Sequence, residues 1–258
     1  MNSRQIPSFL LAGALALACS QASAQIGHTL LPEGFDKVEL GLAVVDAPRH
    51  EGSTDRQVLV MPSVRGNWSN GVFASLGRVG VDLSDDPTIG FGPLLHYGVR
   101  ERRADEPTDS KTSLAVSGGA YAVYMLTPGF DLRSDVLYGG GPDRRGLTVS
   151  AHADYGLHLA SHHRLTISPG VIWASSNYME STFGIDSLQS QADGLPTHSA
   201  RAGVKDLVLG VAWEWEINNR ISLATNATAL RLLGDAASSP LVKQRTNGVY
   251  STTLSYRF

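Results

Sequence analysis

The last nine residues of the chain, 250–258, alternate strictly between two kinds of side chain. Tyr250 and Leu254 fall on one face of an extended chain, while Ser251 and Ser255 fall on the other, because side chains alternate with period two. A segment of about nine to eleven residues, apolar on one face and polar on the other, is typical of a strand that crosses the outer membrane. A soluble sandwich strand can show this alternation once, so a barrel requires that the chain repeat it.

The same alternation recurs along most of the chain. In residues 147–159, leucine, valine, alanine and tyrosine alternate with serine, histidine, aspartate and glycine, and residues 88–100 and 204–217 repeat the idea. A helix could not bury either set on one side, since its period is 3.6. The predicted strands are 37–45, 57–68, 72–83, 88–100, 112–126, 130–138, 147–159, 164–175, 204–217, 221–232 and 248–258.

The connections between these strands alternate in length over the second half of the chain. Short turns on one rim and long loops on the other are typical of an outer-membrane barrel, whose short turns face the periplasm. Within the longest loop we expect a short helix at residues 185–192. The short connections are 127–129, 161–163 and 218–220, and the longer ones are 101–111, 139–145, 176–203 and 234–247.

The strand count is odd, whereas a closed bacterial barrel normally has an even number of strands. The error falls between Gln57 and Arg100, where the strand boundaries are least distinct. We therefore predict one all-β domain, a closed antiparallel transmembrane β-barrel of twelve strands with one of them missed in that stretch. Ten strands, with one assigned in excess, is the second choice.

The first residues predict export. Residues 1–24 read as a cleaved signal peptide, with Arg4 in the positive region, an apolar run at 9–18 and an Ala-Ser-Ala cleavage site at 22–24. The barrel then comprises residues 25–258, and the only cysteine, Cys19, is removed with the signal peptide. A lipoprotein site at that cysteine is the less favoured alternative. No later apolar run approaches the length of a membrane-spanning helix.

Composition agrees with a membrane barrel. Only 17% of the 258 residues are charged, against about 25% in a typical soluble domain. The formal net charge of −3 shows no excess of basic residues of the kind that binds nucleic acid. We expect lipid of the Gram-negative outer membrane around the barrel, and the barrel assembly machinery as a partner during insertion.

Several segments resemble the MltA-interacting protein family, also called MipA/OmpV. The most specific is 232–242, similar to the family's Leu-Gly-Asp-Ala-x-x-Ser-Pro segment. His50 and His198 stand where tyrosine is common in the family, which puts any tyrosine-specific contact in doubt but not the fold. The other segments that carry the resemblance are 47–53 with Pro62, 98–100, 183–185, 192–196 and 256–258.

This resemblance implies an outer-membrane barrel, and we expect that the protein is not an enzyme. For the founding member it implies a scaffold that joins a murein hydrolase to a murein polymerase. The family also contains porin-like and adhesin-like proteins, so the role does not transfer to every member. The leading hypothesis is therefore a scaffold linked to murein synthesis and remodelling, and the alternatives are a narrow diffusion channel, an adhesin and, last, a barrel hydrolase.

We expect no catalytic, cofactor-binding or metal-binding residues. Asp85 and Asp86 precede a proline and fit an ordinary turn better than a pair for acid–base catalysis. Polar side chains on the lumen side of the strand at 147–159 are explained by a wet interior, and adjacent histidines in a turn point apart. The residues weighed for a nucleophile, a base or a metal are His152, Asp154, His158, Ser161, His162 and His163.

Overall fold

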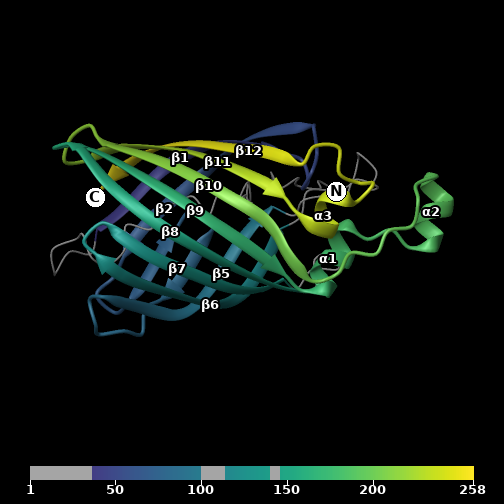
Figure 1. Ribbon diagram of the computed structural model, residues 1–258. Coiled ribbons are helices and arrows are strands. Elements are labelled where there is room, and N and C mark those ends of the chain that lie inside the picture. Colours follow the sequence, from purple (N-terminus) through teal and green to yellow (C-terminus); the bar gives the residue numbers. More distant parts are fainter. Residues whose placement is uncertain (1–36, 100–113, 140–145) are drawn as a thin grey trace, which may run out of the picture.

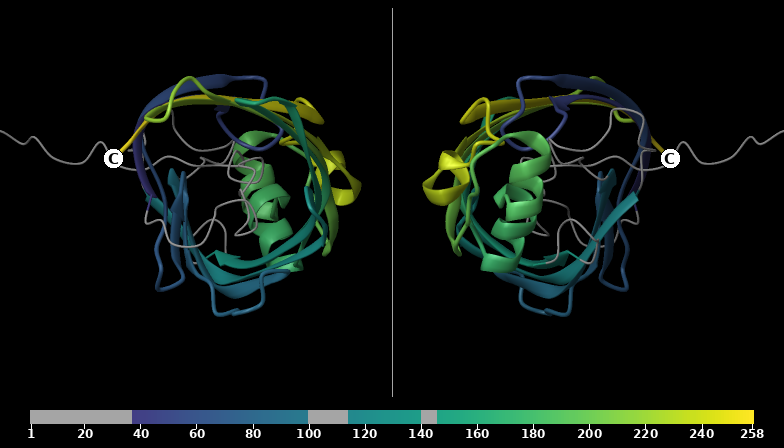
Figure 2. Two further views of the ribbon diagram at one scale, coloured as in Figure 1. Left: turned by 90° about the vertical axis from the view of Figure 1, so that its left-hand side faces the viewer. Right: turned by 90° about the vertical axis from the view of Figure 1, so that its right-hand side faces the viewer.

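The computed structural model describes residues 37–99, 114–139 and 146–258. Within them twelve antiparallel strands form one closed barrel, in which each strand pairs with its neighbours in sequence and β1 pairs with β12. Figure 2 looks along the barrel and shows the ring of strands. The strands are β1 (Lys37–Pro48), β2 (Arg56–Asn67), β3 (Val72–Ser75), β4 (Arg78–Val81), β5 (Ile89–Val99), β6 (Leu114–Thr127), β7 (Phe130–Gly139), β8 (Gly146–Ala160), β9 (His163–Ala174), β10 (Gly203–Glu216), β11 (Ile221–Leu232) and β12 (Thr246–Arg257).

The carboxy-terminal segment closes the barrel. Leu254 of β12 lies opposite Leu42 of β1, and Tyr250 lies opposite Asp46. Leu42 is 55% exposed and Leu254 is 52% exposed, whereas Ser255 is buried. The alternating pattern therefore places apolar side chains on the outer wall and small polar ones in the lumen, as predicted.

The stretch predicted as one strand at 72–83 is two strands. β3 and β4 have four residues each and are joined by Leu76 and Gly77, whose φ of 77° favours glycine. This is the missing twelfth strand, so the preference for twelve over ten is confirmed. The single-strand assignment is wrong because the turn has no Asn, Asp or Pro to mark it.

Because the β3–β4 hairpin is short, most of β2 has a paired strand on one side only among the described residues. The ladder between β2 and β3 has two residue pairs, Gly66 with Ala74 and Asn67 with Phe73. Among the described residues, the rest of β2 is paired only with β1. Pro62 lies in this one-sided part of β2, where a residue without an N–H is tolerated.

Helices lie at the end of the barrel opposite the carboxy terminus (Figure 1). They are α1 (Ser176–Phe183), α2 (Ser187–Asp193) and α3 (Gly234–Ser238). α1 and α3 pack on the rim through Met179, Phe183 and Ala236, while α2 extends away from the barrel. The predicted helix at 185–192 corresponds to α2, and α1 and α3 were not predicted. In the described part of the chain, no helix has the length and apolar content needed to cross a membrane.

The predicted signal peptide at 1–24 and the loops at 101–111 and 140–145 lie outside the described residues. The short turns that follow β6, β8 and β10 are all at the end that holds the carboxy terminus (Figure 1). Because short turns face the periplasm in outer-membrane barrels, we refer to this end as the periplasmic rim. The end with the three helices is the extracellular rim.

Candidate functional site

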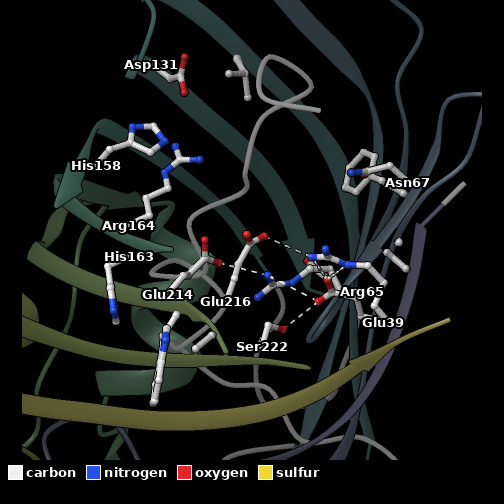
Figure 3. A pocket seen from close by; sticks show the side chains of 18 of the residues that line it. Glu39, Arg65, Asn67, Asp131, His158, His163, Arg164, Glu214, Glu216 and Ser222 are labelled. Carbon is white, nitrogen blue, oxygen red and sulfur yellow. Dashed lines mark hydrogen bonds and ion pairs between the residues drawn. The ribbon is translucent and has the colours of Figure 1, made fainter. Parts of the chain in front are cut away.

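A cavity of about 300 Å³ occupies the periplasmic half of the lumen (Figure 3). One wall carries a network of ion pairs from β1, β2, β10 and β12. Glu39 accepts hydrogen bonds from Nε and Nη2 of Arg257, at 2.8 and 2.6 Å. Arg65 donates to Glu214 at 3.1 Å. Both guanidinium groups in this wall are thus neutralised by carboxylates.

The opposite wall carries polar residues of β7, β8 and β9. Arg164 of β9 is paired in register with His158 of β8, and both side chains point into the cavity (Figure 3). Asp131, the second residue of β7, lies on the same side. These residues face the lumen because they occupy the polar face of strands whose other face meets lipid.

An apolar cluster borders the cavity. Phe73 and Tyr121 meet edge to face with ring centroids 5.2 Å apart, and Leu94 and Leu137 pack with them. Val123 borders this cluster and lines the cavity. The cavity therefore offers both charged and apolar contacts.

Buried charges fill the middle of the lumen. Arg78 of β4 donates to Asp135 of β7 at 2.9 Å, and Arg133 lies 3.5 Å from Asp154. Arg78, Arg133 and His152 are each at most 3% exposed. We call the four residues Arg78, Arg133, Asp135 and Asp154 the central charge layer. It lies inside the lumen against the part of the wall formed by β4 to β8.

A second buried group fixes the extracellular end. The Lys205 ammonium donates to Glu51 at 2.9 Å and to Asp206, and the Tyr178 hydroxyl donates to Glu51 at 2.8 Å. Lys205 and Asp206 are both buried although they are adjacent, because the register of β10 shifts between Val204 and Asp206. This group ties the loop after β1 to β10 and α1.

Two carboxylates outside the strands, Asp86 and Asp235, have lowered pKa values. Hydrogen bonds from the Thr88 backbone N–H and hydroxyl, at 2.8 and 2.7 Å, lower the pKa of Asp86. The backbone N–H and Nε of Arg201 donate to Asp235, at 3.0 and 3.2 Å, and lower the pKa of that carboxyl. Asp86 thus closes the turn predicted at Asp85 and Asp86.

The histidines weighed from the sequence do not form one group. His152 lies beside the central charge layer, and Asp154 is part of it. His158 and His162 line the cavity. His163 stacks on Trp213 and Trp215, with centroids 5.7 and 5.6 Å away. Within the described residues there is no cluster of three His, Cys, Asp or Glu side chains that could hold a metal ion.

The sequence did not predict which charged side chains form ion pairs inside the barrel. Arg78 sits in the hairpin that was assigned as one strand, so its inward direction could not be predicted. Glu51 and Lys205 are 154 residues apart, and no local pattern joins them. The alternation of polar residues in the strand at 147–159 did place His152 and Asp154 inside the barrel correctly.

Tyr178 does not lie on the outer wall of the barrel. It is instead buried in α1, 8% exposed, under the contact with Glu51. Tyr138, Tyr250 and Tyr256 are 54%, 52% and 40% exposed on the outer wall, as amphipathic rings at the headgroup level would be.

A closed twelve-stranded barrel with lipid-compatible outer residues and a polar lumen defines the class of outer-membrane β-barrel proteins. The structure is similar to that of the NanC porin, with a TM-score of 0.51 and 10% identity over 84% of this chain and 100% of the porin. It also aligns with the translocator domain of the autotransporter NalP from Neisseria meningitidis (TM-score 0.49, 14% identity, 88% of this chain and 90% of that one). Comparison with curated protein sequences gave no match.

The family model of the MltA-interacting protein MipA matches residues 40–258. The chain therefore belongs to the MipA family. This agrees with the resemblance seen in the sequence, and the match covers eleven complete strands and nearly all of β1.

Proposed function

We propose that this protein is a non-enzymatic interaction protein of the outer membrane, which holds murein-remodelling enzymes at the inner leaflet. The observation that carries the proposal is the family match over residues 40–258, whose description names interaction with MltA. A murein hydrolase is therefore the first partner to test, and a murein polymerase is the second.

The filled lumen supports an interaction role over a diffusion channel. Barrels of eight strands fill their interior with side chains, and those of sixteen or more leave a water channel. Twelve strands lie between these limits, so the side chains decide. The central charge layer puts two buried opposite-charge pairs inside the lumen along β4, β7 and β8, which supports a narrowed, closed barrel.

The periplasmic rim is the part of the barrel that murein enzymes can reach. Its turns are exposed at residues 85–88, 161–162 and 217–220. They carry side chains able to form polar contacts, among them His162, Asn219 and Arg220. We place the partner contact on this rim, together with the polar residues at the mouth of the cavity.

The test is co-purification of the tagged protein from envelopes in mild detergent, probed for murein hydrolases and polymerases. The double variant His162→Glu with Arg220→Glu should recover less of the partner. The first change adds a negative charge to the rim, and the second replaces a positive charge with a negative one. Gln191→Glu in α2, at the other end of the barrel, is the matched control and should recover as much as the wild type. Absence of any murein enzyme from the wild-type sample would refute the scaffold role and leave the barrel unaffected.

A further inference from the structure

Two charged side chains in the periplasmic cavity have no partner among the described residues. Nε of Arg164 and Oδ1 of Asp131 are both buried and make no hydrogen bond. Asp131 is only 8% exposed, and the two groups are not close enough to form an ion pair with each other. A buried carboxylate without a partner is costly, and the Arg164 guanidinium is only partly buried and lines the same cavity. A site with one group of each sign is therefore expected to have a ligand.

The strands hold these two residues on either side of β8. Asp131 of β7 is in register with Asp154 of β8, and Arg164 of β9 is in register with His158 of β8. The Arg164 side chain lies over Gly156, where an added Cβ would stand 2.9 Å from Nη2 and 3.2 Å from Nε. Glycine at this position therefore leaves room for the guanidinium against the wall.

The other arginines of the cavity are already neutralised. Arg65 and Arg257 share the carboxylates of Glu39, Glu214 and Glu216. This wall has three carboxylates for two guanidinium groups, so it does not need an anion. An anionic group of a ligand would go to Arg164, and a cationic group would be attracted to Asp131 and to the excess carboxylate.

We propose that the cavity binds a small zwitterion with a free ammonium and a free carboxylate, of the size of a dipeptide. Arg164 receives the carboxylate through paired N–H donors, and Asp131 accepts from the ammonium. Apolar side chains of the ligand contact Val123 and Met125, which line the same cavity. A volume of about 300 Å³ is at the lower end of the range for small-molecule sites. The proposal goes beyond the scaffold role and does not require it.

The experiment is calorimetric titration of the full protein in a non-ionic detergent, because a zwitterionic detergent head group would compete. The probes are alanyl-alanine, its N-acetyl derivative, which lacks the ammonium, and its amide, which lacks the carboxylate. Alanyl-alanine should bind, and each blocked derivative should bind about tenfold more weakly or worse, since each loses one charge-assisted contact. Equal binding of a blocked derivative would overturn the proposal. So would the absence of alanyl-alanine binding at a dipeptide concentration on the order of 10 mM, about tenfold above the dissociation constant of a typical weak site.

Variants assign the two charges separately. Arg164→Leu should weaken the dipeptide about tenfold and abolish the difference between the dipeptide and its amide. Asp131→Asn, which keeps the shape, should abolish the difference between the dipeptide and its N-acetyl form. Arg231→Leu changes an exposed arginine near the other rim and should leave all three titrations unchanged.

Folding is checked separately, so that a lost signal is not mistaken for a lost site. Gly156→Ala keeps both charges and displaces only the guanidinium, and it should weaken the dipeptide while the barrel retains its resistance to unfolding in detergent. If Arg164→Leu and Asp131→Asn are folded and bind the dipeptide like the wild type, the site assignment is wrong.

Discussion

Arg78 and Asp135 show what a single side chain does inside this barrel. Arg78 is 1% exposed and Asp135 is 5% exposed, and their charged atoms are 2.9 Å apart. Removing one partner of a buried pair leaves the other charge uncompensated, whereas removing both can be nearly neutral. The central charge layer is thus sensitive to single changes in a way that the outer wall is not.

We predict that Arg78→Met lowers the free energy of unfolding by about 3 to 5 kcal/mol, because it leaves the Asp135 carboxylate buried alone. The double variant Arg78→Met with Asp135→Leu should lose clearly less than this single variant. Urea unfolding in phospholipid vesicles, followed by tryptophan fluorescence, measures both.

The matched control is the ion pair of Arg56 with Asp46, whose atoms are 2.9 Å apart but whose side chains are 36% and 39% exposed. Solvent screens such a pair, so Asp46→Asn should cost less than about 1 kcal/mol. A similar loss for Asp46→Asn and Arg78→Met would show that burial does not determine the strength of these pairs.

Among the elements, α2 owes its start and end to local residues. The Asp186 side chain accepts from the N–H groups of Leu188 and Gln189, both at 2.8 Å, and the Gln189 side chain accepts from the Asp186 N–H at 3.2 Å. Gly194 ends the helix with φ of 68°. This reciprocal cap explains how seven residues stay helical away from the barrel wall.

We predict that Asp186→Ala loosens α2 without affecting the barrel. Losing the cap costs about 1 kcal/mol, which corresponds to about fivefold faster cleavage by a protease specific for leucine, since Leu188 is 76% exposed. Mass spectrometry of the fragments measures the rate. Gln191→Ala, in the same helix but outside the cap, is the control, and equal cleavage of the two variants would contradict the role of Asp186.

For the whole molecule, we predict that the central charge layer keeps the barrel from conducting. The wild-type protein in a planar bilayer should give no current steps above the lipid baseline. A variant with alanine at Arg78, Arg133, Asp135 and Asp154 should give steps, because it removes two charges of each sign and opens the middle of the lumen.

The control for conductance is Arg56→Ala with Asp46→Ala, which removes one exposed pair at the extracellular end of β1 and β2. This variant should stay closed. Steady conductance of the wild type would support the diffusion channel and remove the argument from the filled lumen.

The sequence predicted most of the wall and little of what fills it. Strict alternation correctly predicted which face of β5, β8, β10 and β12 points outward, because one face of each strand meets lipid and the other faces the lumen. The boundaries of β11 were predicted to the residue. The hairpin of β3 and β4 was missed because four-residue strands are too short to show a period.

The candidate site could not be predicted in the same way. His158 and Asp154 were placed on the lumen side, but their cross-strand neighbours were not recognised. Strand pairing puts Arg164 opposite His158 and Asp131 opposite Asp154. The signal peptide at 1–24 and the absence of catalytic, cofactor and metal residues stay predictions.

The sequence by itself determined that this chain forms a closed barrel, which side of each strand meets lipid, and which rim carries the long loops. The first two properties follow from a period of two along each strand, and the third follows from the alternating lengths of the connections. Only the tertiary structure decided which lumenal charges pair and which two, Arg164 and Asp131, are left facing a cavity. The physical reason is that inward side chains meet across the barrel, so their partners depend on strand register and tilt and not on sequence neighbours.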